Sequence, residues 1–192
     1  MNIDIVSIIY LIIRLSPLLV VSHFVLQSIL NMDSKGVVYL FGLVTTSLIT
    51  MAVGAAMPFE MTAPDIDCKS MGLGEYENVS MSQVTLGFTY GYLMYIILNF
   101  AEKGKTFLSS NIPTVVLFPL LIIGNGLWQS KCIGYPILLM SLALGIGGGI
   151  VWGYALKTAG YKHLALFNGI SNRAICSKPS KTKFKCVKGR NA

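Results

Sequence analysis

The chain has 192 residues, of which 54% are hydrophobic and only 12% are charged. Soluble domains carry about 25% charged residues, so this composition excludes an ordinary soluble domain and indicates a chain whose solvent is lipid. The net charge of +7 does not describe a basic globule, because residues 157–192 hold nine of the fifteen Lys and Arg and no Asp or Glu. We therefore predict one apolar bundle, residues 1–156, followed by a basic tail.

Five apolar runs predict five membrane-spanning helices, because a span needs about 20 mostly apolar residues. The first run contains Arg14, Ser16 and Pro17, so it is either one kinked span or an interfacial helix to about residue 14 followed by a span. Both versions cross the membrane once. The expected fold is all-α, a polytopic transmembrane bundle with spans at residues 5–30, 37–57, 83–100, 112–128 and 135–156.

Charge asymmetry between the loops predicts the orientation. Loop 58–82 carries five acidic residues against Lys69, whereas the tail, 157–192, is purely basic. By the positive-inside rule the N-terminus and the acidic loop are non-cytosolic and the tail is cytosolic. We expect the tail to engage a protein partner or anionic lipid; nucleic acid is a partner that no motif supports. The candidate contacts are Lys178, Lys181, Lys183, Lys185, Lys188 and Arg190.

The four cysteines fall on both sides of the predicted membrane. Cys68 and Cys132 share the non-cytosolic side, and a disulfide can form between them if that compartment is oxidising. Cys176 and Cys186 lie in the basic tail without the His or Cys companions that a zinc site requires. No metal and no cofactor are expected.

Small and polar residues within the spans predict helix packing. Glycines at four-residue spacing let helices approach closely in lipid. Asn99 and Asn125 are candidates for interhelical hydrogen bonds, and His23 is expected at a helix interface. The glycines expected to form packing seams are Gly87 and Gly91 in the third run and Gly145, Gly149 and Gly153 in the last.

Three segments on the non-cytosolic side have a familiar order. They are Thr50 with Met57-Pro58, then Val79-Ser80-Met81-Ser82-Gln83, then Trp128 to Leu138 with Tyr135-Pro136. This layout resembles the type-2 phosphatidic acid phosphatase (haloperoxidase-like) superfamily over roughly residues 45–155. The stretch from Ala63-Pro64 through Cys68 to Gly74 is similar to versions found in large DNA viruses. The resemblance implies a lipid-phosphatase-like core.

The residues that carry the chemistry of that superfamily are replaced. Its members use two His, an Asp, a Lys and two Arg to form a phospho-His intermediate and to hold the phosphoryl oxygens. Pro58 and Ser80 are retained. The replaced positions are Thr50 for the Lys, Met57 for the first Arg, Ser82 for one His, Trp128 for the second Arg, Gly134 for the nucleophilic His and Leu138 for the Asp.

These losses predict a protein that is not an enzyme. Removing one preorganised charge donor typically costs about 100–1,000-fold in rate, and here the nucleophile and every cation are absent. The expected function is a non-catalytic structural or scaffold protein of a membrane, with the viral resemblance implying the inner membrane of a large DNA virus particle. The alternatives are a lipid-binding or lipid-transport module and, third, a lipid phosphatase with substituted residues.

Overall fold

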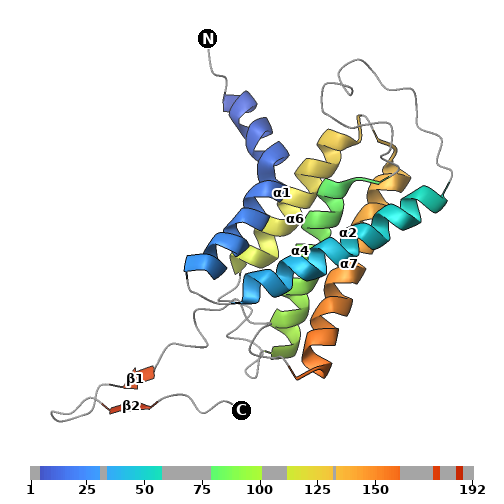
Figure 1. Ribbon diagram of the computed structural model, residues 1–192. Helices are drawn as coiled ribbons and strands as arrows, with labels where there is room; N and C mark the ends of the chain where they lie inside the picture. Colours follow the sequence, from blue (N-terminus) through green and yellow to red (C-terminus); the bar gives the residue numbers. More distant parts are fainter. Residues whose placement is uncertain are drawn as a thin grey trace.

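The computed structural model describes residues 5–30, 34–57, 79–100, 112–131, 133–160, 175–177 and 185–187. Each of the five apolar runs forms one helix, so the helical prediction is confirmed for the bundle (Figure 1). Two short strands in the basic tail were not predicted. The elements are α1 (Ile5–Leu30), α2 (Lys35–Ala56), α4 (Met81–Phe100), α6 (Ile112–Gln129), α7 (Tyr135–Thr158), β1 (Ile175–Ser177) and β2 (Lys185–Val187).

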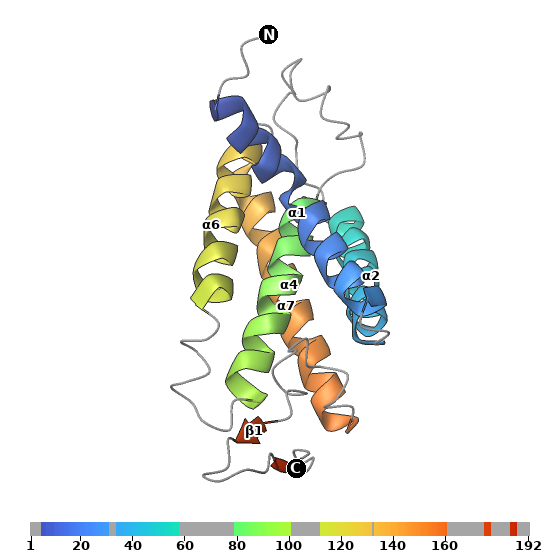
Figure 2. The same cartoon turned by 90° about the vertical axis from the view of Figure 1, so that its left-hand side faces the viewer.

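Helix α4 occupies the centre of the bundle and contacts the other four helices. Figures 1 and 2 both show α4 and α7 side by side along their length. Helix α6 packs on α4, α2 packs on α7, and α1 contacts α2, α6 and α4. The first half of α4 carries several polar side chains, which its central position keeps away from the outer surface.

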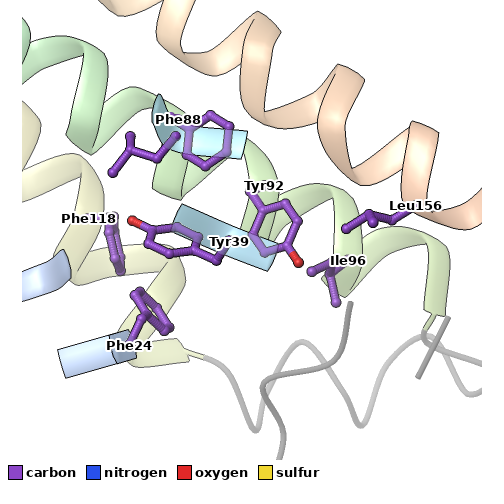
Figure 3. Close-up of a cluster of buried hydrophobic side chains, with 8 residues drawn as sticks. Phe24, Tyr39, Phe88, Tyr92, Ile96, Phe118 and Leu156 are labelled. Atoms are coloured by element: carbon purple, nitrogen blue, oxygen red, sulfur yellow. The ribbon is translucent and has the colours of Figure 1, made fainter. Parts of the chain in front are cut away.

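Aromatic side chains fill the middle of the bundle (Figure 3). Tyr39 of α2 packs between Phe24 of α1 and the stacked rings of Phe88 and Tyr92 of α4. The Tyr39 hydroxyl lies 2.6 Å from Thr89 Oγ1. The Thr89 hydroxyl donates within its own helix, so Tyr39 is the donor across the helices. This bond joins α2 to α4 at a position closed to solvent.

Helix α1 runs unbroken through Arg14 and Pro17, so a break near residue 14 does not occur. Proline has no N–H, and Pro17 therefore leaves the carbonyl of Ile13 without its helical donor. The Ser16 hydroxyl donates to that carbonyl at 2.7 Å. A side chain of α6, Asn125, donates to it as well, at 3.3 Å. Such substitutes allow a proline inside a helix in lipid.

The outer surface is apolar. Three of the described helices are long and apolar enough to cross a membrane: Leu11–Leu30, Lys35–Ala56 and Tyr135–Thr158. Of the apolar window in each, only 17%, 33% and 33% is buried inside the bundle. Large hydrophobic side chains on these helices therefore point outward, as expected where lipid replaces water. For α4 and α6 the prediction of a membrane crossing remains a prediction.

His23 departs from its predicted place. Its side chain is exposed rather than at a helix interface, and its ring lies edge-on to Phe24 with centroids 5.6 Å apart. Asn99 and Asn125 do link helices, as predicted. Asn99 Oδ1 accepts a hydrogen bond of 3.1 Å from Lys157 of α7, and Asn125 bonds both α4 and α1.

Candidate functional site

Five neutral polar side chains are buried together where α4 begins, α6 ends and α7 begins. Each is at most 8% exposed. They come from three helices that are separate in sequence, and they coincide with the end of the bundle where the superfamily resemblance places its chemistry. We call this set the polar network: Ser80, Gln83, Asn125, Gln129 and Ser141.

Ser80 is the N-cap of α4 and the junction of the polar network. Its Oγ accepts a hydrogen bond from the Gln83 backbone N–H at 3.3 Å, the geometry of a serine cap. The same Oγ donates to Gln129 Oε1 of α6. Its backbone N–H donates at 3.0 Å to Ser141 Oγ of α7, and that hydroxyl donates at 2.7 Å to the Ile137 carbonyl. Ser80 therefore fixes the start of α4 to both neighbouring helices.

The Gln83 amide extends the polar network along α6. Its Nε2 donates to the Ile122 carbonyl at 3.2 Å and to Asn125 Oδ1 at 3.4 Å. Asn125 then reaches the Ile13 carbonyl in α1. One continuous chain of hydrogen bonds thus connects α1, α6, α4 and α7. Gln83 Oε1 is the one buried side-chain polar atom among the described residues without a hydrogen-bond partner.

The positions predicted from the superfamily motif differ in how deeply they are buried. Thr50 is buried on α2 and its hydroxyl bonds the Thr46 carbonyl of the same helix at 2.8 Å. Met57 is exposed at the end of α2, and Ser82 is half-buried. Pro58 lies outside the described residues.

The motif positions of the last hairpin lie at or near the ends of α6 and α7 that it joins. Gly134 is the N-cap of α7, and the Leu138 side chain is buried. Trp128 is half-buried, with the Lys131 ammonium 5.5 Å from its ring centroid. Ser80 is joined to this hairpin through residues outside the predicted motif, Gln129 and Ser141. Those two gave no sequence signal beyond being polar within or beside an apolar run.

The chemistry available at the polar network is hydrogen bonding. General acid–base catalysis needs a group that titrates near the operating pH. Among the described residues, the buried polar side chains apart from the tyrosines of the aromatic core are Ser, Thr, Asn and Gln, all neutral. The described ranges also hold no cluster of three or more His, Cys, Asp or Glu that could bind a metal ion. The amides and hydroxyls present are suited to joining helices.

Glycines bring α4 and α7 into direct backbone contact. A Cβ at Gly87 would lie 2.9 Å from the Leu142 carbonyl oxygen. A Cβ at Gly145 would lie 2.5 Å from the Val84 carbonyl oxygen. The same closeness holds for Gly91 against the backbone of Ile146, for Gly149 against Phe88 and Tyr92, and for Gly153 against the Tyr95 ring. This α4–α7 seam leaves no room for a lipid chain between the two helices.

No family model matches the chain, and no match was found among curated proteins or solved structures. The resemblance to the lipid-phosphatase superfamily therefore rests on the arrangement of residues 45–155 alone. Ser80, which that arrangement retains, has a structural explanation here as a helix cap.

Most of the predicted tail contacts fall outside the described residues. Lys185 begins β2. The predicted pair Cys68 and Cys132 also falls outside those residues. The predicted tail contacts that fall outside the described residues are Lys178, Lys181, Lys183, Lys188 and Arg190.

Proposed function

We propose that this chain is a non-catalytic integral membrane scaffold, in which a rigid helical bundle holds a basic tail at one membrane face. The polar network carries the proposal. Its side chains are neutral, and their hydrogen bonds run from helix to helix instead of converging on an open site. Interhelical hydrogen bonds and small-residue contacts are the forces that assemble helices in lipid.

The proposal includes descent from the lipid-phosphatase-like superfamily with loss of its chemistry. Support comes from the order of the three segments between residues 45 and 155, together with the surroundings of the replaced positions. An apolar Leu138 is packed in the bundle at the aspartate position, and a helix cap, Gly134, stands at the position of the nucleophile. The inner membrane of a large DNA virus particle is the setting that the resemblance suggests.

The proposed orientation follows from the loop charges. Five crossings place loop 58–82 on the non-cytosolic side and residues 157–192 on the cytosolic side. Each Lys or Arg near an anionic membrane surface contributes about 1 kcal/mol of attraction. The nine bases of the tail therefore suit anionic lipid or an acidic protein surface.

Phosphate release tests the absence of catalysis. The full chain is reconstituted into vesicles containing phosphatidic acid, and inorganic phosphate is measured over time. We expect the same release as from protein-free vesicles, because the described polar network offers neither a nucleophile with a base nor a cation for the phosphoryl group. Release above that level, abolished by Ser80→Ala in a variant that keeps its helical circular dichroism, would contradict the proposal.

Labelling of cysteines tests the orientation. A maleimide that cannot cross membranes is added, after mild reduction, to intact cells that carry the chain in their plasma membrane. We expect it to modify Cys68 at once and Cys176 only after the membrane is permeabilised. Labelling in the reverse order would mean that the tail faces the non-cytosolic side.

A further inference from the structure

Two cysteines of the basic tail occupy opposite positions in a small antiparallel pair of strands. Strands β1 and β2 pair with Ile175 opposite Val187, Cys176 opposite Cys186 and Ser177 opposite Lys185. Figure 1 shows the two strands side by side, away from the helices. Nine residues separate the cysteines in sequence, so sequence spacing alone does not place them opposite each other.

This backbone register meets the distance requirement of a disulfide. Directly opposed residues in an antiparallel pair have Cα atoms about 4.5 or 5.5 Å apart, depending on the hydrogen-bonding pattern. Disulfides form across Cα separations of about 4.4–6.8 Å. Both kinds of opposed position lie within that range. Directly opposed positions of an antiparallel pair share a face of the sheet, and a shift of one residue would put these two positions on opposite faces.

We propose that Cys176 and Cys186, juxtaposed by the β1–β2 register, are a redox modification site that closes into an intrachain disulfide. The oxidant is a disulfide, either a small molecule or a thiol oxidoreductase. The thiolate of one cysteine attacks it, forms a mixed disulfide and releases one thiol. The second cysteine then displaces the other half as a thiol. Two cysteine thiols are oxidised, and the oxidant is reduced to two thiols.

The inference is independent of the scaffold role, because it uses only the pairing of two strands. In the proposed orientation the tail faces a reducing compartment, where the dithiol is the resting state. The disulfide then forms when the oxidant concentration rises and reopens when it falls. Closure links the two strands covalently and fixes their register.

The test uses the full chain in detergent with Cys68→Ser and Cys132→Ser, so that only the tail thiols report. After exposure to oxidised glutathione, free thiols are counted with a maleimide of high mass on a non-reducing gel. We expect two labels before oxidation, none after it, a monomeric band throughout, and recovery of both labels with dithiothreitol. Persistence of both labels, or a disulfide-linked dimer in place of the monomer, would overturn the inference.

A register-shifted variant is the matched control. Ile175→Cys combined with Cys176→Ser, in the same background, keeps two tail cysteines but moves one of them to the other face of β1. We expect its oxidation to be at least roughly tenfold slower than that of the native pair, because opposed faces do not allow disulfide geometry. Equal rates would show that the tail closes as a flexible chain and that the register has no role.

Discussion

Single glycines set the distance between α4 and α7. At Gly149, an added Cβ would lie 2.7 Å from the Tyr92 backbone nitrogen and would also overlap the Phe88 carbonyl. Two residues earlier, Gly147 has nothing within 4 Å of the same position. The two glycines are equally helical, so they separate the packing effect of a methyl group from its effect on helix propensity.

Gly149→Ala should destabilise the bundle by about 1–3 kcal/mol, because the backbone of α4 would have to move away from the new methyl group. Gly147→Ala should be neutral or stabilising by up to about 1 kcal/mol, since alanine favours a helix. Unfolding of both variants in mild detergent, followed by tryptophan fluorescence, measures the difference. Equal stability of the two variants would mean that the α4–α7 seam is not tightly closed.

At the scale of elements, α1 receives a hydrogen bond from a neighbouring helix at its proline. Pro17 removes one backbone donor, and the Ile13 carbonyl accepts instead from Ser16 of α1 and from Asn125 of α6. Farther along, the Gly36 backbone N–H of α2 donates at 3.0 Å to Ser28 Oγ of α1. The first half of α1 is therefore coupled to α6 and the second half to α2.

Asn125→Leu should loosen the first half of α1 and leave the α4–α7 pair intact. The substitution removes the donor to Ile13 and the acceptor of Gln83, at a cost of about 1 kcal/mol, typical of interhelical hydrogen bonds in membranes. Hydrogen exchange should rise around Ile13 and stay unchanged around Gly145. Asn99→Leu, at the opposite end of α4, is the control and should leave the exchange of α1 unaltered.

At the scale of the whole molecule, the apolar surface requires lipid or detergent. Leu48 of α2 is 61% exposed, near the middle of a helix long enough to span a bilayer. A cation at such a position costs about 3 kcal/mol in membrane insertion. We expect Leu48→Arg to reduce the fraction that resists extraction by alkaline carbonate, whereas Leu48→Phe should behave like the native chain. Equal extraction of both would place this face of α2 away from lipid.

The sequence predicted the helices because apolar runs are long and their ends are marked by polar residues. It also placed the glycines of α4 and α7 on faces suited to close contact.

Membership of the polar network was harder to predict. Gln129 and Ser141 are ordinary polar residues until the lateral arrangement of α4, α6 and α7 is known. The pairing of Cys176 with Cys186 was missed because a three-residue strand has too short a pattern to detect.

The central position of α4 has a consequence for biosynthesis. Helices α1 and α2 emerge before α4 and are long and apolar enough to cross a membrane, whereas α4 is not among the helices that meet that standard. The surface that covers the glycine face of α4 belongs to α7, which is synthesised some fifty residues later. Until α7 is synthesised, the polar start and the small-residue face of α4 lack this cover. The central helix of the bundle, α4, is therefore synthesised before α7, the helix that covers its glycine face.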